Sequence, residues 1–247
     1  MSLTEINIRE KKFHDNLQSK KGERFENIFY KAIYNVNEDF LNYLRNNVEN
    51  AEVLDYGCGT GSSVEKIAKF KPKNITGIDI SEISINKAKE KARQLKIEVN
   101  FSVDNCEKTK LSNDSFDIVY GTGILHHLQI EKCLDEIHRI LKSKGNLIFI
   151  EPLGTNPIIN LYRKLTPKSR SKDEHPLINK DFKYISEKFI ETKIKYYGFL
   201  TLIFLPFYKS PENSNLFKIL SSLDNLLFKI KFLKFLAWSI LIKGQKN

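Results

Sequence analysis

Residues 51–63 read AEVLDYGCGTGSS, a short apolar run that ends in an acid and leads into three glycines at alternate positions. Val53 and Leu54 predict a buried strand. Glycine tolerates positive φ and lets a ligand approach the backbone, and apolar residues at helical spacing follow from Val64. The turn is therefore expected to lead into a helix N-terminus with free N–H groups that can bind a ligand. A plain glycine-rich turn of an α/β protein is the alternative.

Two kinds of cofactor site begin with such a turn, and the glycine spacing separates them. The dinucleotide fingerprint G-x-G-x-x-G has two residues in its second gap, whereas here Gly61 follows Gly59 after one, and Ser62 takes the fingerprint's last position. The pattern instead resembles the first motif of the class I S-adenosylmethionine (SAM) methyltransferases. The resemblance implies that cofactor-binding residues here include Asp55, Tyr56, Gly57, Cys58, Gly59 and Gly61.

Residues 74–81 hold a second predicted strand, which ends in an acid. This acid, Asp79, lies 24 residues after Asp55. An acid at such a strand end can accept both hydroxyls of a ribose, a role shared by nucleotide-binding α/β folds. A plain strand-end cap is the alternative for Asp79. The predicted cofactor contact includes its neighbour Ile80.

A further acid ends the third predicted strand, residues 99–103. In the family that the sequence resembles, an acid here contacts the adenine amino group and the next residue contacts the ring. These roles fall on Asp104 and Asn105, and the assignment extends to Cys106. Residues 114–119, DSFDIV, also match the family's run into its fourth strand. Acids at successive strand ends, in this order, make the resemblance specific.

Strands and helices alternate along residues 49–151, which predicts a parallel sheet with right-handed crossovers. After the fourth strand, a helix is expected to end at Gly145 and the fifth strand to cover residues 146–151. The ligand cleft of such a fold lies beyond the carboxyl ends of the strands. The residues expected at that edge are Gly57, Asp79, Asp104, Gly121 and Glu151, with Gly121 assigned to the cofactor.

The resemblance also implies the rest of the fold. It is a Rossmann-like α/β fold with a seven-stranded, mostly parallel sheet, helices on both faces, and an antiparallel last strand beside the fifth. We expect that last strand at residues 237–243 and the sixth strand within residues 196–207. We treat residues 1–247 as a single methyltransferase domain. Its parts are an N-terminal helical cap (1–48), a SAM-binding core (49–151), and an acceptor-side segment with the last strands (152–247).

Candidate proton acceptors follow the fourth and fifth strands. A hydroxyl acceptor must lose a proton, and His126 and His127 lie in the loop that faces the expected cleft. Packing and hydrogen bonding around the cofactor are the alternative roles of these two residues. Glu174 and His175 can also accept a proton and lie in a polar segment that lines the acceptor site in similar enzymes. A solvated loop is the alternative there.

The segment at residues 12–15, KFHD, combines an aromatic ring with titratable groups near the N-terminus. Methyltransferases similar to this chain often close such a segment over the cofactor. A surface helix is the alternative.

Two motifs that some methyltransferases carry after the fourth strand are missing. Certain ubiquinone-pathway O-methyltransferases bind a metal through Glu-x-x-Glu-His, but the matching positions here are Gly123, His126 and His127. We therefore expect no metal. Methyltransferases of base amino groups hold a flipped base with Asn/Asp-Pro-Pro-aromatic, whereas residues 121–124 read GTGI. This weighs against nucleic acid as an acceptor through its base amino groups, though not against every RNA substrate.

The net charge of +10 is concentrated in the C-terminal part. Residues 151–247 hold 17 Lys/Arg against 8 Asp/Glu, and residues 216–235 mix lysines with Leu, Ile and Phe. Such a segment can contact an anionic membrane surface peripherally, wall a pocket for an apolar acceptor, or bury the interface of a homodimer. Core packing in a monomer, with solvating lysines, is the remaining alternative.

The composition is that of a globular protein, with 41% hydrophobic and 28% charged residues among 247. The polar start, MSLTEINIREKK, shows no secretory signal, and no apolar run reaches the roughly 20 residues that span a bilayer. Three cysteines without metal-like spacing fit a reducing compartment. We expect a cytoplasmic protein.

Together these features predict an enzyme that transfers a methyl group from SAM to a hydroxyl or an amine of a small molecule, such as a sugar or a lipid-linked intermediate. Two alternatives stay open. One is an RNA methyltransferase that uses the basic C-terminal part, and the other is a SAM-binding protein without transfer activity.

Overall fold

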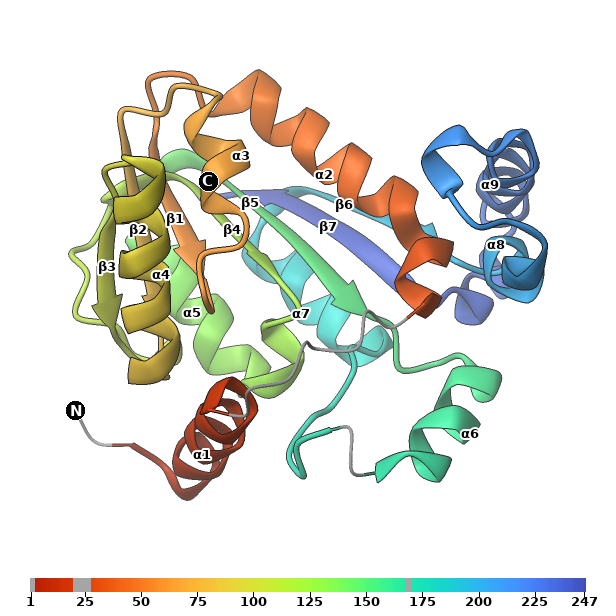
Figure 1. Cartoon of the computed structure of the whole chain (residues 1–247), viewed down its shortest axis with the longest axis horizontal. Coiled ribbons are helices and arrows are strands. Elements are labelled where there is room, and N and C mark those ends of the chain that lie inside the picture. Colours follow the sequence, from red (N-terminus) through yellow and green to blue (C-terminus); the bar gives the residue numbers. More distant parts are fainter. Residues whose placement is uncertain (1–2, 20–27, 168–169) are drawn as a thin grey trace.

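The computed structural model describes residues 3–19, 28–167 and 170–247. Within these ranges a seven-stranded sheet of order β3-β2-β1-β4-β5-β7-β6 runs through the middle of the molecule (Figure 1). The strands are β1 (Glu52–Tyr56), β2 (Asn74–Asp79), β3 (Asn100–Val103), β4 (Phe116–Thr122), β5 (Leu141–Pro152), β6 (Ile190–Tyr197) and β7 (Ser239–Gln245). The prediction of a Rossmann-like α/β fold is confirmed.

The strand directions place several loops at one edge. β1 lies between β2 and β4 and is parallel to both, with Asp55 opposite Gly77 on one side and Tyr120 on the other. β7 is antiparallel to both β5 and β6, as predicted for the last strand. Because parallel strands end at the same edge of a sheet, the loops after β1, β2, β3 and β4 meet there.

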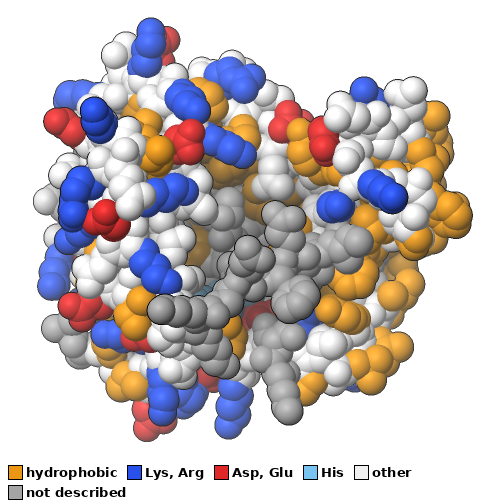
Figure 2. Space-filling view, in the orientation of Figure 1, with side chains coloured by type: hydrophobic (Ala, Val, Ile, Leu, Met, Phe, Trp, Pro, Cys, Tyr) orange, Lys and Arg blue, Asp and Glu red, His pale blue; other side chains and the backbone are white. Residues whose placement is uncertain are grey.

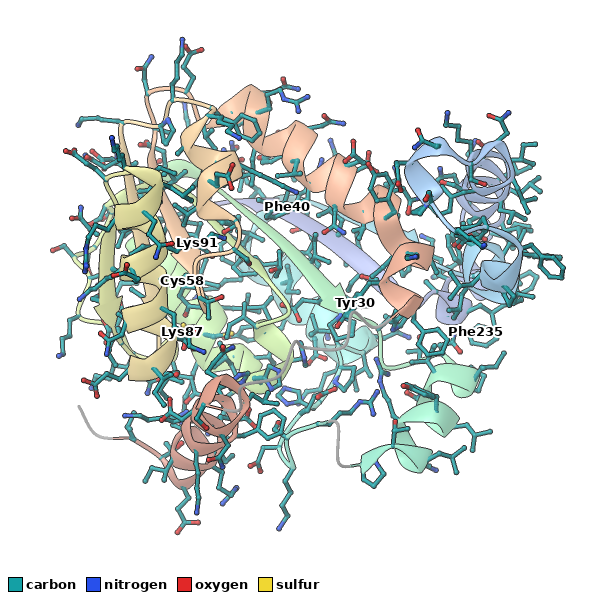
Figure 3. The ribbon with its side chains drawn as sticks, viewed as in Figure 1. Tyr30, Phe40, Cys58, Lys87, Lys91 and Phe235 are labelled. Carbon is teal, nitrogen blue, oxygen red and sulfur yellow. The ribbon has the colours of Figure 1, made fainter. Side chains whose placement is uncertain are left out.

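Three helices cover one face of the sheet: α2 (Tyr34–Asn47), α3 (Val64–Ala68) and α4 (Glu82–Leu95). α2 buries Val36, Phe40 and Leu44, which recur every fourth residue and so form one stripe against the strands. Phe40 is labelled in Figure 3. Its ring meets the ring of Tyr120 on β4 edge-on, with 6.0 Å between the ring centroids.

The opposite face carries α5 (Ile130–Ile140) and α7 (Asn179–Lys188). Leu134 of α5 and Ile185 of α7 are fully buried there. Alternate residues of each strand serve the two cores, so Ile148 packs with α2 whereas Phe149 packs with α5 and α7. The sheet is therefore covered on both faces, and a ligand cleft of such a fold is expected at its carboxyl edge.

The predicted N-terminal cap consists of two differently placed parts. α1 (Glu5–Ser19) lies beside α4 at the carboxyl edge of the sheet, whereas the 3-10 helix η1 (Ile28–Ile33) runs into α2 on the face (Figure 1). Residues 20–27, which the prediction counted as helical, lie outside the described residues.

Short helices follow β5 and β6. They are α6 (Pro157–Leu165), α8 (Leu200–Ile203), η4 (Leu205–Phe207), η5 (Pro211–Asn213), α9 (Asn215–Leu227) and η6 (Lys231–Leu236). Leu205, Phe217 and Leu220 form a small separate core with Ala32 of η1. Among the described helices, none is long and apolar enough to cross a bilayer.

Two predicted boundaries are wrong. β6 covers Ile190–Tyr197. The prediction joined the apolar residues 200–203 to the sixth strand, but these residues form α8. Gly198, at φ +81°, turns the chain out of the sheet before them. The fifth strand begins at Leu141 rather than residue 146, because α5 ends at Ile140 and a register shift against β4 accommodates the extra residues.

Candidate functional site

The glycine turn after β1 is tied to β2 and to the loop after β4. The N–H groups of Gly57 and Cys58 both donate to the carbonyl of Ile78 at 2.9 Å. Gly57 has φ +74°, and a Cβ there would lie 2.5 Å from Cγ1 of Ile124, so a side chain has no room. Gly59 differs, because at φ +51° an added Cβ would meet no heavy atom of the described residues within 4 Å. Its backbone is thus open to the close approach of a cofactor.

Asp79 ends β2 beside this turn, as predicted. Its Oδ2 accepts a hydrogen bond from the N–H of Gly59 at 2.9 Å, and its Oδ1 accepts one from the N–H of Ser81 at 2.8 Å. Burial raises the pKa of Asp79, and the two backbone donors oppose that shift. Each oxygen keeps a lone pair after these bonds, so Asp79 can cap its strand and still accept ribose hydroxyls. Ile80, the first residue after β2, is partly buried.

The predicted adenine residues follow β3 and meet α1. Asp104 is buried, and its two carboxylate oxygens accept the N–H groups of Asn105 at 2.9 Å and Lys110 at 2.8 Å. Asn105 donates through Nδ2 to Oδ1 of Asn7 on α1 at 3.1 Å. The loop after β3 is therefore fixed by Asp104 and covered by the N-terminal helix.

Other predicted cofactor residues hold the frame of the site. The Tyr56 hydroxyl donates to the carbonyl of Cys106 and joins β1 to the segment after β3. Gly121 packs backbone against backbone on the turn, since a Cβ there would lie 2.7 Å from the carbonyl oxygen of Tyr56. Ser63 donates to Asp55, and burial raises the pKa of Asp55 to about 7. Burial also raises the pKa of the Cys106 thiol, which keeps it neutral.

Glu151, at the end of β5, organises the loop after β4 and its 3-10 helix η2 (Leu125–His127). The side chain is fully buried, and its Oε1 accepts the N–H groups of Ile124 at 2.9 Å and Leu125 at 2.8 Å. Its Oε2 lies 2.7 Å from Nδ1 of His126. The carboxylate therefore caps η2 and fixes the ring of His126.

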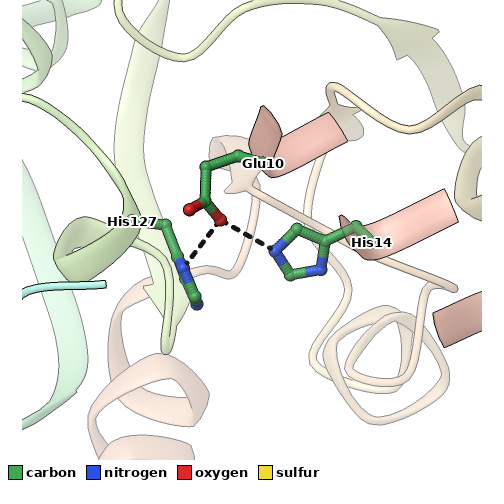
Figure 4. A group of neighbouring side chains, drawn as sticks. All are labelled: Glu10, His14 and His127. Atoms are coloured by element: carbon green, nitrogen blue, oxygen red, sulfur yellow. Dashed lines mark ion pairs between the residues drawn. The ribbon is translucent and has the colours of Figure 1, made fainter. Parts of the chain in front are cut away.

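His127 makes a contact with α1 that the sequence analysis did not predict. Its Nδ1 lies 3.0 Å from Oε2 of Glu10, and Oγ of Ser171 lies 3.4 Å from the same nitrogen. His14, one helical turn after Glu10, places Nε2 3.7 Å from the same carboxylate oxygen (Figure 4). Burial raises the pKa of Glu10, but the hydrogen bonds from His127 and Ser171, with the charges of both histidines, outweigh it and leave that pKa below its ordinary value.

The segment before α7 places Glu174 beside His126 and His127 and leaves the ring of His175 exposed. A ring nitrogen of His126, a ring nitrogen of His127 and a carboxylate oxygen of Glu174 all lie within 4.8 Å of one another. The N–H of His175 donates to the carbonyl of His126 at 2.8 Å, while its imidazole faces solvent. Arg170 places Nε 3.5 Å from Oε1 of Glu174. Three of the four predicted catalytic side chains therefore lie together. Residues 168–169 of the acceptor-side segment lie outside the described residues.

α1 closes over both halves of the site. Asp15 accepts a hydrogen bond from the hydroxyl of Ser81, near Asp79, a predicted cofactor residue. Arg9 makes two hydrogen bonds of 2.7 and 2.8 Å to Asp173 on the acceptor side. Lys87 reaches from α4 toward α1 (Figure 3). The helix thus joins the cofactor residues to the Glu174 segment.

Glu10 was missing from the sequence prediction, although His14 lay in the segment at residues 12–15. A spacing of four on a helix places both side chains on one face, but nothing in the sequence points to their partner His127. The donor atoms of this group lie within 4.8 Å of one another, so the group could hold an ion. The prediction of no metal, which rested on missing carboxylates after β4, stays a prediction.

Comparison with known sequences identifies related proteins. A family model described as "Methyltransferase domain" matches residues 47–198. Relatives include phosphoethanolamine N-methyltransferase 3 of Arabidopsis thaliana, 28% identical over 165 residues, and sterol 24-C-methyltransferase erg6 of Aspergillus fumigatus, 32% identical over 135 residues. These matches cover 62% and 53% of this chain but 34% and 36% of the relatives, so the chain spans about a third of their length.

Solved structures share the fold. Geranyl diphosphate C-methyltransferase of Streptomyces coelicolor A3(2), in complex with Mg²⁺, geranyl diphosphate and S-adenosyl-L-homocysteine, superimposes over the whole of both chains with a TM-score of 0.66 at 14% identity. Phosphoethanolamine N-methyltransferase 2 of Haemonchus contortus gives a TM-score of 0.61 at 18% identity, covering 87% of this chain and 53% of its own.

Proposed function

Because the chain belongs to the methyltransferase-domain family and has a class I, SAM-dependent domain, we propose that it transfers the methyl group of SAM to a hydroxyl or an amine of a small, lipid-linked molecule. One observation carries this proposal. The glycine turn with Asp79 and the group around His127 share one edge of the sheet, and Gly57 of the turn packs directly on Ile124, just before the histidine loop.

The chain's residues at the ends of β1, β2 and β3 fit SAM. Gly59 offers backbone without a side chain, and Asp79 offers two oriented oxygens for a ribose. Asp104 shapes the loop that would take the adenine. When bound, SAM supplies a methyl group on a positively charged sulfur for in-line transfer to a nucleophile. Carboxylates gathered at this edge favour a cationic cofactor.

On the acceptor side we assign His127 as the proton acceptor for a hydroxyl. Its Nδ1 faces Glu10 and Ser171, which leaves Nε2 to take the proton. Glu10 positions the ring and stabilises the positive charge that the ring gains. His126 is bound instead to Glu151, which also caps η2, so its role is to shape the loop. An amine acceptor that is already neutral would need alignment alone.

The names of relatives support a lipid-linked acceptor over a soluble sugar. They include enzymes named for sterols and, in Bacteroides fragilis, for demethylmenaquinone, at 29% identity over 104 residues. The acceptors in these names are small and largely apolar molecules.

Transfer of labelled methyl from SAM to a total lipid extract tests the proposal, with a parallel reaction on total RNA. We expect label in a lipid fraction and background label in RNA. The variant His127→Gln should lose transfer, whereas His138→Gln, which alters a histidine on α5, should keep it. Label in RNA alone would establish the RNA alternative, and SAM binding with no label in lipid, RNA or small molecules would establish a binding protein.

A further inference from the structure

A large apolar surface lies on the helices that follow β5 and β6. It comprises α6, α8, η4, α9 and η6, and we call it the apolar face. Hydrophobic side chains gather along this margin of the molecule, over α8 and α9 above and α6 below (Figure 2). Monomeric proteins seldom expose a continuous apolar surface of this kind unless it binds something.

Two helices of the apolar face each present an ordered stripe to solvent. On α9 four residues recur at spacings of three and four, beside the stripe of Phe217 and Leu220 that is buried: Leu216, Ile219, Leu223 and Leu226, between 37% and 58% exposed. On α6 the same spacing recurs in Ile158, Leu161 and Leu165, which are 59%, 58% and 73% exposed. Each helix therefore has more apolar surface than the chain itself covers.

The elements of the apolar face adjoin one another. The hydroxyl of Thr155 donates to the carbonyl of Phe235 at 3.1 Å, so η6 lies against the start of α6. Phe235 sits at this margin between α8 and α6 (Figure 3). Phe207 of η4 and Phe232 of η6 are each 72% exposed. Large aromatic and aliphatic side chains thus project from neighbouring elements rather than from scattered sites.

The charge of the apolar face selects its partner. Within residues 157–165 and 200–236, which hold these elements, the exposed charged residues are one acid, Glu212, and five lysines: Lys164, Lys209, Lys218, Lys229 and Lys231. A second copy of the chain would set this basic surface against an identical one, which like charges oppose. An anionic bilayer offers apolar chains to the stripes and negative headgroups to the lysines.

We propose that the apolar face docks the protein on the surface of an anionic membrane, with α6, α9 and η6 lying in the headgroup region. The proposal deepens the proposed function, on which it rests for the identity of the acceptor. α6 runs into the segment that carries Arg170 and Glu174, and Arg170 lies 5.5 Å from the ring of Tyr162 on α6. Docking therefore brings the acceptor side of the site next to the lipid.

Flotation of the full chain with vesicles tests the proposal. We expect the protein to float with phosphatidylcholine vesicles that contain phosphatidylglycerol, more weakly with pure phosphatidylcholine, and less as salt rises. Leu165→Gln and Phe232→Gln should each weaken vesicle binding about tenfold, because each removes one exposed apolar anchor. Leu95→Gln, which changes an exposed leucine at the far end of α4, should bind like the wild type.

Calorimetry with SAM distinguishes a failure of membrane docking from a failure of the proposed function. All three variants should bind SAM like the wild type. Wild-type protein that stays unbound in every vesicle mixture would overturn membrane docking. The proposal would also be overturned if Leu165→Gln and Phe232→Gln both bound vesicles as well as the wild type does. A dimer in sedimentation without vesicles, lost in the same two variants, would assign the apolar face to a second copy and also overturn the proposal.

Discussion

Nδ1 of His127 lies 3.0 Å from Oε2 of Glu10, a residue 117 positions earlier in the chain. His127 follows β4, whereas Glu10 is carried by α1, which also contacts Asn105 and Asp173. The carboxylate therefore reaches the histidine only when α1 is docked over the edge of the sheet. In the proposed function, α1 in this position covers the cofactor and completes the acceptor site, an arrangement that excludes water from the transfer.

Glu10→Gln should lower kcat about 100-fold while the affinity for SAM stays within a few-fold, because the change removes a charge from the acceptor side and leaves Asp79 intact. Glu10→Asp should retain part of the rate, since it keeps the carboxylate. Steady-state kinetics and SAM calorimetry on both variants check this. A full kcat in Glu10→Gln would remove Glu10 from the acceptor site.

The glycine turn allows a matched pair of variants. Gly57→Ala should destabilise the fold, because its methyl group would lie 2.5 Å from Ile124 at a φ of +74°. Gly59→Ala has room among the described residues and should cost the fold only about 1 kcal/mol, yet its methyl group would occupy the ligand side of the turn. We expect Gly59→Ala to keep most of its thermal stability and to lose SAM affinity at least about tenfold. Unchanged affinity would place the cofactor elsewhere.

Asp55 should make stability depend on pH. Burial raises its pKa from 3.8 to about 7, so between these values the folded chain holds a proton that the unfolded chain has lost. The free energy of unfolding should therefore fall as pH rises from about 4 to about 7, by about 4 kcal/mol in total, and level off above.

Asp55→Asn removes this dependence. Urea unfolding of both proteins without cofactor should give similar stabilities near pH 4, with the variant the more stable of the two above pH 7. If the free energies of unfolding of the two proteins changed in parallel between pH 4 and pH 7, the raised pKa of Asp55 would be contradicted.

Removal of metal ions should leave the transfer rate unchanged, in line with the prediction that no metal takes part. Glu10, His14 and His127 are nevertheless close enough to hold an ion, so the prediction can fail in a specific way. The measurement is the rate after dialysis against a chelator. A loss of rate that added Zn²⁺ restores in the wild type, but not in His14→Ala, would establish a metal site.

The fold was predictable from the sequence where local patterns carry it. The short strand before Gly57 and the acids Asp79 and Asp104 are features of a few neighbouring residues, and the family they resemble supplied the strand order. The boundary of β6 was not predictable, because residues 200–203 are as apolar as a strand and only the left-handed conformation of Gly198 separates them from it. Periodicity does not reveal that turn.

The candidate cofactor residues follow from such local patterns, whereas the contacts of the candidate catalytic residues do not. His126, His127 and Glu174 were predicted by residue type, but their partners depend on contacts between distant segments. Glu151 caps η2 and also lies 2.7 Å from Nδ1 of His126, and Glu10 comes from the N-terminal helix α1. Neither contact leaves a spacing in the sequence.

Calorimetric titration of SAM into the wild type, Asp79→Lys and Glu90→Lys tests the central claim most directly. Asp79 accepts hydrogen bonds from the N–H groups of Gly59 and Ser81 and is the proposed ribose ligand, whereas Glu90 is exposed on α4. We predict binding to the wild type, equal binding to Glu90→Lys, and none to Asp79→Lys. No binding to the wild type, or unchanged affinity in Asp79→Lys, would contradict a SAM site at this edge.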